Sequence, residues 1–322
     1  MKKLLTIVIT AVLLITCILT LISCDSADYT VGICQLVTHD ALDAATQGFM
    51  DALQEEMDKA GKTVKFDLQN AQNDASICTT IVNKFNAQQV DLILANATPA
   101  LDAARSVTKT IPILGTSITE YGVALGRDDI TNGIIGGNIS GTSDLAPLDR
   151  QAQMIVDLVP SAQKVGLLYC SAEPNSSFQA NEIKKYLEAA GKTCTVYTFT
   201  DTTDISAIAE SAAQNSDVIY VPTDNTVAHN TSTIDTACKK YNVPVIAGEE
   251  GICKGCGIAT LSISYYNLGV ATGKMAAQIL LNGADISTMK IAYDEEPVYK
   301  YDKERCELYG ITVPDNYVEL VK

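Results

Sequence analysis

The chain has 322 residues, of which 47% are hydrophobic and 19% are charged, and this balance excludes intrinsic disorder and fits two domains of ordinary size. It has 23 lysines and arginines against 38 aspartates and glutamates, a formal net charge of −15. Binding to a nucleic-acid backbone needs clustered cations, so no nucleic-acid partner is expected. The two histidines, His39 and His229, are too few for most histidine-based metal or catalytic sites, and surface positions are expected for both.

Residues 1–23 have the pattern of an export signal. Lys2 and Lys3 precede an apolar run over residues 4–22, which ends in the sequence LISC at 21–24 with acidic residues after it. A branched apolar residue three before a cysteine, with a small residue directly before it, resembles the bacterial lipobox. The pattern predicts a lipoprotein signal peptide over 1–23, a lipid anchor on Cys24, a linker over 24–28 and an extracytoplasmic mature chain. An uncleaved anchor helix is the alternative, disfavoured because no basic flank follows the run.

After the signal, short β-rich runs alternate with amphipathic helical runs. In the first half we expect strands at 29–36, 63–69, 92–95 and 111–114, and helices at 43–60, 75–87 and 100–108. In the second half we expect strands at 164–169, 193–198, 218–221 and 243–247, and helices at 145–159, 176–190, 204–213 and 226–241. Such alternation is typical of right-handed βαβ units and parallel sheets. The predicted fold class is therefore α/β, with two doubly wound, Rossmann-like lobes.

The two halves have matching features at the ends of their strands. Pro112 and Pro244 introduce the fourth strand of each half, and turns with proline and small polar residues follow each third strand, at 96–99 and 222–225. Ligands bind at the carboxyl ends of such sheets, so we expect a cleft between the lobes.

The expected lobes are connected through a hinge. The polar stretch 136–144 reads as a hinge strand, and a second crossing is expected near 262–266, before a helix at 267–281. The expected first lobe covers 29–139 plus about 264–292, and the second covers 140–263 plus about 293–322.

Ten cysteines are present, and eight remain after Cys17 in the signal and Cys24 at the lipid site. An even number in an exported chain is compatible with disulfides, but their scatter over apolar elements favours buried free thiols. Cys253 and Cys256 form the one close pair, in what reads as a glycine-rich turn, so a local disulfide or no special role is expected there. No second pair stands at a distance suited to a zinc site.

Five stretches together carry a family resemblance: VGICQLVTHDALD at 31–43, NISGTSD at 138–144, VPTDNTV at 221–227, AGEEG at 247–251 and YYNLG at 265–269. They resemble the substrate-binding lipoproteins of a bacterial ABC import system, in the group that includes tryptophan- and tyrosine-type binding proteins. The resemblance implies a type I periplasmic-binding-protein fold with three crossovers, a hinge, permease partners and an amino acid, often aromatic, as ligand. Cys34, Cys253 and Cys256 depart from the family pattern, which leaves the ligand preference open.

A free amino acid in a closed cleft sets three chemical requirements. Its carboxylate binds N–H groups at helix starts and small hydroxyls, its ammonium needs a carboxylate, and its side chain needs an apolar or aromatic wall. We predict Asp224 as the ammonium partner, with helix capping as the ordinary alternative for that residue and Glu249 or Glu250 as the alternative partner.

Further ligand-binding residues are expected at strand ends and helix starts: Gln35, Thr98, Ser117, Thr119, Thr142, Ser143, Asp144, Asn175, Ser176, Ser177 and Asn225. Thr142, Ser143 and Asp144 are expected to open a helix beside the hinge. Four aromatic residues are candidate walls, with core packing as their ordinary role: Tyr121, Phe178, Tyr265 and Tyr266.

The predicted function is a monomeric, lipid-anchored extracytoplasmic receptor that delivers a free amino acid, aromatic or branched apolar, to an ABC importer. An α/β enzyme is the rival. The chain has no GxGxxG after its first strand, no GxxxxGK[ST] and no GxSxG, so an enzyme is disfavoured, and no cofactor or metal is expected. A lipoprotein that senses the ligand and signals to a partner remains an alternative.

Overall fold

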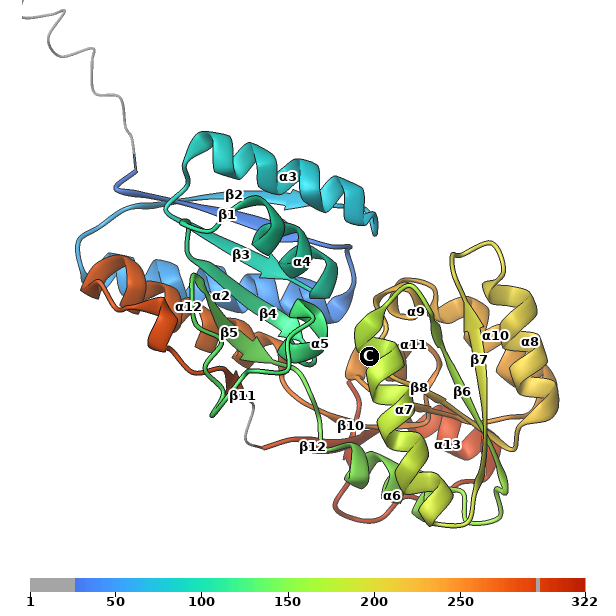
Figure 1. Ribbon diagram of the computed structural model, residues 1–322. Helices are drawn as coiled ribbons and strands as arrows, with labels where there is room; N and C mark the ends of the chain where they lie inside the picture. Colours follow the sequence, from blue (N-terminus) through green and yellow to red (C-terminus); the bar gives the residue numbers. More distant parts are fainter. Residues whose placement is uncertain (1–26, 294–295, 322) are drawn as a thin grey trace, which may run out of the picture.

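The computed structural model describes residues 27–293 and 296–321. The predicted signal peptide, Cys24 and part of the linker lie outside the described residues. Two α/β lobes lie side by side (Figure 1), each with its own sheet. In the part of the chain that the structure describes, no helix is both long enough and apolar enough to span a membrane.

The first lobe is built on a six-stranded parallel sheet of order β11-β5-β4-β3-β1-β2. Its strands are β1 (Tyr29–Gln35), β2 (Val64–Asn70), β3 (Leu92–Asn96), β4 (Ile113–Ile118), β5 (Ile139–Ser143) and β11 (Ala292–Tyr293). Its helices are α2 (Asp40–Lys59), α3 (Ala75–Gln88), α4 (Thr98–Val107), α5 (Tyr121–Leu125) and α12 (Tyr265–Asn282), with the 3-10 turn η1 (Ile286–Thr288).

The second lobe has a seven-stranded sheet of order β13-β12-β10-β9-β8-β6-β7, in which β12 runs antiparallel to β10. Its strands are β6 (Lys164–Cys170), β7 (Thr193–Phe199), β8 (Val218–Val221), β9 (Val245–Ala247), β10 (Ala259–Ser262), β12 (Val298–Tyr301) and β13 (Val318–Glu319). Its helices are α6 (Leu148–Leu158), α7 (Pro174–Ala189), α8 (Ile205–Asn215), α9 (Asn225–His229), α10 (Thr231–Tyr241), α11 (Glu250–Cys256) and α13 (Lys303–Tyr309).

The two prolines play the same part in both lobes. Proline has no N–H to donate, so it is tolerated at the first position of a strand while its carbonyl can still accept a hydrogen bond. The carbonyl of Pro112 accepts from the N–H of Ile93 at 2.9 Å, and that of Pro244 accepts from the N–H of Ile219 at 3.0 Å. The fourth strand of each predicted series therefore begins directly after its proline, two residues later than the expected starts at 111 and 243.

Three connections join the lobes, from β5 to α6, from β10 to α12 and from β11 to β12. Residues 140–143 belong to the first sheet because β5 pairs with β4, whereas the sequence placed them in the second lobe. Thr142 and Ser143 end this strand, and the next helix begins only at Leu148, so the expected helix start at 142–144 is wrong. The sheet requires glycine at position 141, because a Cβ there would lie 2.0 Å from the carbonyl oxygen of Gly115.

Two further local expectations are wrong. The single helix expected at 226–241 divides at Asn230 (φ −127°, ψ 26°) into α9 and α10. Cys253 and Cys256 lie in helix α11 rather than in a turn, because the Glu249 side chain caps the helix despite its two glycines. All eight cysteines of the described chain are free, and all but Cys194 are buried, in agreement with the free-thiol expectation.

Candidate functional site

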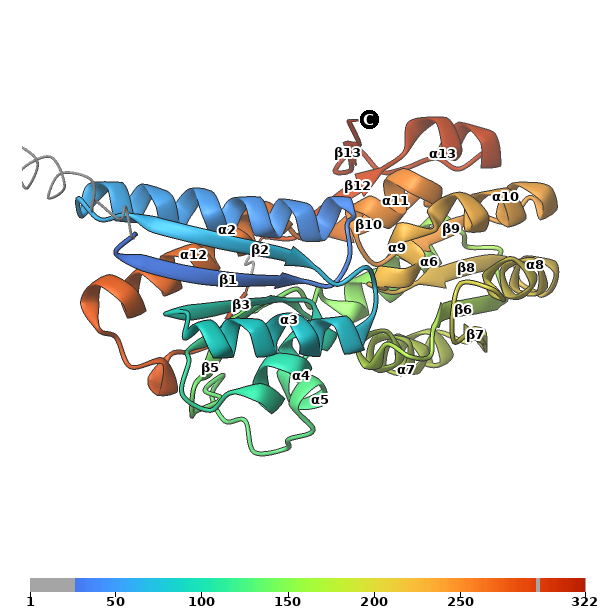
Figure 2. The same cartoon turned by 90° about the horizontal axis from the view of Figure 1, so that it is seen from above.

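The candidate site lies between the lobes. The arrowheads of β1, β3 and β4 point toward the second lobe (Figure 1), and the N-terminal end of α2 points the same way (Figure 2). A cavity of about 560 Å³ is lined by loops of both lobes, among them those with Asn73 in the first and Glu173 in the second. A second cavity, of about 190 Å³, lies between the starts of α2, α11 and α12. The cleft expected at the carboxyl ends of the strands is therefore present.

Three hydrogen bonds close this cleft. His39 Nε2 lies 3.2 Å from Asn225 Oδ1, Asn73 Nδ2 donates to Thr226 Oγ1 at 3.1 Å, and His229 Nδ1 lies 3.1 Å from the carbonyl oxygen of Thr38. Each joins a loop of the first lobe to α9 of the second. A plain surface position for both histidines was expected. His39 is instead half-buried between the lobes, and His229, although exposed, also makes a contact across them.

Asp144 lies directly after β5, at the first crossing, with only 3% of its surface exposed. Its N–H donates to the carbonyl of Ile118, and its Oδ2 accepts from the Tyr265 hydroxyl at 2.9 Å. Its Oδ1 is buried and has no hydrogen-bond partner in the described chain. Burial raises the pKa of this carboxyl, although the nearby hydroxyls of Thr119 and Tyr265 oppose the shift. An unpartnered buried carboxylate oxygen is costly, so the arrangement suits a cationic group that binds there.

Two other predicted residues have buried oxygens without a partner among the described residues. Ser117, on β4 close to Asp144, has a free Oγ and a left-handed backbone with φ +56°, a conformation that costs about 1–3 kcal/mol in a residue with a side chain. Asn175, at the start of α7, has a free Oδ1, while its Nδ2 donates to the carbonyl of Thr223 at 2.9 Å. The unpartnered atoms therefore come from both lobes.

Asp224 is fully engaged within its own lobe. Its Oδ1 accepts from the N–H of Val227 and its Oδ2 from the N–H of Cys170, each at 2.8 Å. Burial, and then the nearby carboxylate of Glu173, raise the pKa of Asp224 well above its usual range. The geometry matches the capping role stated as the alternative for this residue, and its role as ammonium partner stays a prediction.

Glu249 lies in a similar setting at the start of α11. Its carboxylate accepts from the N–H groups of Gly251 and Ile252 at 2.6 and 2.5 Å, and burial raises its pKa to about 7. Across the described chain, no lysine or arginine forms an ion pair with Asp144, Glu173, Asp224 or Glu249. The buried carboxyls thus favour a ligand that carries positive charge.

Several predicted residues use their side chains inside one lobe. Gln35 accepts from the Thr46 hydroxyl and donates to Asp43, both on α2. Thr142 pairs with the hydroxyl of Thr272 at 2.9 Å, and Ser143 donates to the carbonyl of Thr119 at 2.8 Å. These bonds hold the ends of β1, β4 and β5 in place.

The remaining predicted residues lie at the two helix starts or on α9. Thr98 is buried at the start of α4, Ser176 donates to the carbonyl of Thr223 at 3.1 Å, and Ser177 is half-buried on α7. Asn225 donates from Nδ2 to Glu173 at 2.7 Å. Thr98 and Asn225 are next in sequence to Pro99 and Thr226, which line the cavity of about 560 Å³.

Sequence reasoning missed Glu173, Asn73 and Thr226, and it named Tyr265 only as a candidate wall. Glu173 accepts from the N–H and side chain of both Asn225 and Thr226, at 2.7–2.9 Å. Its position directly before Pro174 and a helix was the one available signal, since acidic residues are favoured at helix starts.

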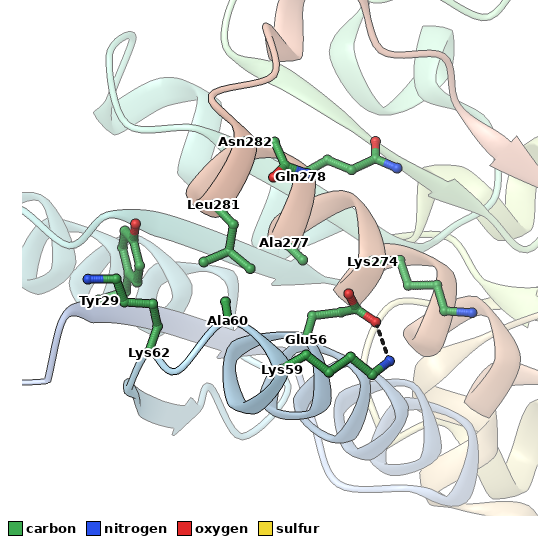
Figure 3. Close-up of a pocket in the computed structure, with 10 residues that line it drawn as sticks. All are labelled: Tyr29, Glu56, Lys59, Ala60, Lys62, Lys274, Ala277, Gln278, Leu281 and Asn282. Carbon is green, nitrogen blue, oxygen red and sulfur yellow. Dashed lines mark hydrogen bonds and ion pairs between the residues drawn. The ribbon is translucent and has the colours of Figure 1, made fainter.

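A groove of about 710 Å³ at the other end of the first lobe is not a candidate site (Figure 3). It is lined by Tyr29 at the start of β1 and by the last turns of α2 and α12, and Lys59 on its rim is paired with Glu56. Ligands of open α/β sheets bind at the carboxyl ends of the strands, and this groove lies at the amino end of β1.

A profile of the family described as "ABC transporter substrate binding protein" matches residues 30–320. The chain belongs to this family. Its members are solute-binding receptors of importers, so the protein is an extracytoplasmic substrate-binding protein and the enzyme alternative is wrong. The family recognised in the sequence motifs is thereby confirmed.

Relatives of known structure support the same assignment. A complex with L-tryptophan from Streptococcus pneumoniae is 30% identical, covering 92% of this chain and 100% of that chain, with a TM-score of 0.85. A leucine-binding protein from Thermotoga maritima, 13% identical over 80% of this chain and 84% of that one, superposes with a TM-score of 0.60, which supports the predicted type I fold.

Two further relatives come from Clostridioides difficile. A tyrosine-binding protein is 34% identical over 256 residues, 78% of this chain and 72% of that protein. A ligand-free, open structure of a substrate-binding protein with adhesive properties is 33% identical, covering 91% of this chain and 99% of that chain, with a TM-score of 0.69. The TM-score of this protein is lower with the open structure than with the tryptophan complex. This difference agrees with the three hydrogen bonds that join its two lobes across the cleft.

Proposed function

We propose that this protein binds a free amino acid with an aromatic or branched apolar side chain and delivers it to ABC permease subunits. The observation that carries the proposal is the buried, unpartnered Oδ1 of Asp144. A charge-assisted hydrogen bond from an α-ammonium group would satisfy this oxygen and compensate the cost of its burial. The relatives described as tryptophan-bound and tyrosine-binding support an amino acid as the ligand class.

The other two parts of an amino acid also have candidate partners. The hydroxyl of Ser117 and the backbone N–H groups at the starts of α4 and α7, near Thr98 and Asn175, offer donors to an α-carboxylate. The unpartnered Oδ1 of Asn175 can only accept. The ring of Tyr265 is fixed by its hydrogen bond to Asp144, and Phe178 is half-buried on α7. These two rings are the candidate wall for an apolar side chain.

The proposal is tested by identifying what the protein carries. Native mass spectrometry of the freshly purified protein, followed by calorimetry with each of the common amino acids, should find one or a few aromatic or branched residues. A retained sugar or peptide, together with no heat from any free amino acid, would contradict the proposed ligand class.

We also infer that the mature chain is a monomer held at the membrane by lipid on Cys24. The support is the LISC sequence after a basic and apolar leader. Cys24→Ala should abolish incorporation of radiolabelled palmitate, because no thiol remains to carry the lipid. It should also leave unprocessed precursor, because the peptidase of the lipobox cuts before that cysteine.

Cys17→Ala is the matched control for that experiment. It removes a thiol from the same leader but leaves the LISC sequence intact, so labelling and processing should match those of the wild type. Uptake of palmitate by the Cys24→Ala protein would contradict the anchor assignment. Sedimentation of the mature domain as a dimer would contradict the monomer.

A further inference from the structure

Both histidines of the chain meet the opposite lobe through the same short element. His39, in the loop between β1 and α2, reaches Asn225 on α9, while His229 at the end of α9 reaches the carbonyl of Thr38. Asn225 Oδ1 and the carbonyl of Thr38 accept, so each imidazole donates. Asn73 adds a third bond, to Thr226 of α9. The loops of the first lobe therefore close onto a single helix of the second.

Several hydrogen bonds within the second lobe hold helix α9 in place. Asp224 caps its start by accepting from Val227, and Glu173 accepts four hydrogen bonds from Asn225 and Thr226. Bonds to charged acceptors are about twice as strong as neutral ones, and these are buried. The outer side of α9 therefore presents Asn225 Oδ1 and Thr226 Oγ1 at fixed positions to the approaching lobe.

From this arrangement we propose that His39, Asn73, His229 and α9 form a latch that stabilises the closed cleft. The inference rests on the proposed function and concerns how long a bound amino acid is held. Hinge opening moves the loops of one lobe away from α9 of the other, so the three bonds exist only in the closed state. Because the latch favours that state, it raises affinity without depending on contact with the ligand.

His39 also makes the latch sensitive to acid. Its Nδ1 is buried without a hydrogen-bond partner in the described chain, so a proton added there has no acceptor. Burial lowers the pKa of His39 below its usual range. The hydrogen bond to Asn225 opposes this shift, as do the carboxylates of Glu173, directly before α7, and of Asp43 and Asp40 on α2. In an open cleft the imidazole is in water with a pKa near 6.5. Protonation therefore favours opening, and affinity should fall as the pH drops below about 6.5.

The test compares His39→Ala, His39→Gln and the double variant His39→Ala/Asn73→Ala with L-tryptophan and L-tyrosine as probes. One lost hydrogen bond corresponds to a factor of about 3 to 10, and two to about 10 to 100. We expect dissociation to accelerate by these factors while association rates stay within about twofold. Glutamine keeps an N–H donor and cannot titrate, so His39→Gln should bind like the wild type at pH 7.5 and lose less affinity at pH 5.5.

Asn83→Ala is the matched control, since Asn83 is exposed and bonds only within its own helix, to the carbonyl of Thr79. Equal dissociation rates in the wild type and the double variant would overturn the latch, as would a His39→Gln protein as impaired as His39→Ala. A wild type that binds neither these probes nor any branched apolar amino acid contradicts the proposed function instead. In that case small-angle scattering without ligand tests the latch. The latch predicts a larger radius of gyration for the double variant than for the wild type, and equal radii would overturn it.

Discussion

Replacing Asp144 by Asn is expected to weaken amino-acid binding by roughly 10²- to 10³-fold. If its unpartnered oxygen receives the ligand's ammonium, the substitution leaves a buried positive charge without its counter-charge, which typically costs about 3–5 kcal/mol. Asn has the same shape and can still accept from the Tyr265 hydroxyl, so folding should be little affected. Calorimetry on both proteins gives the affinities, and thermal melts show whether the variant is intact.

Asp224→Asn is the informative comparison, because the sequence alone favoured Asp224 as the ammonium partner. In the structure both of its oxygens accept backbone N–H groups, of Val227 and Cys170. Asn keeps one oxygen that can cap α9 by accepting from Val227, but its NH2 group then faces the N–H of Cys170, which loses its acceptor. This unpaired N–H should lower stability by about 1–3 kcal/mol, and affinity should change less than tenfold. If Asp224→Asn abolishes binding and Asp144→Asn does not, Asp224 is the ammonium partner and the proposal for Asp144 is refuted.

Much of the fold was predictable because its signals are local. Apolar runs such as 92–95 and 218–221, separated by amphipathic helices, indicate parallel strands without any knowledge of contacts. The two local failures have different causes. The stretch 136–144 was expected to be a hinge strand that opens a helix at 142–144, but residues 139–143 pair with β4, where Gly141 closely approaches Gly115. Residues 251–256 were expected to form a glycine-rich turn, but the side chain of Glu249 caps a helix there.

The site was only partly predictable, since residue type and strand-end position do not tell which lone pairs are already used. Gln35, Thr142 and Asp224 stand at the expected strand ends, yet each is bonded within its own lobe. Asp144 differs only in one oxygen that its neighbours leave unpaired. The contact between His39 and Asn225 spans 186 positions of sequence, so no local pattern could have revealed it.

The second large effect is expected from Gly269→Leu, which tests how α12 returns to the first lobe after the second crossing. A Cβ at position 269 would lie 2.0 Å from the carbonyl oxygen of Ala45 and 2.9 Å from the backbone nitrogen of Phe49, both on α2. Backbone cannot yield as a flexible side chain does, so the two helices must separate. Their separation opens the core around Phe49 and Met275, which are buried between them.

Such overpacking costs about 1–3 kcal/mol and occasionally more, and a backbone clash places Gly269→Leu at or above the upper end. Thermal unfolding should then occur roughly 6–12 °C lower, at about 2–4 °C per kcal/mol for a chain of this size. Lys274→Ala, an exposed site on the same helix, should stay within about 0.5 kcal/mol of the wild type. If Gly269→Leu unfolds at the same temperature as Lys274→Ala, α12 does not pack on α2 through this glycine. Other contacts must then position the second crossing.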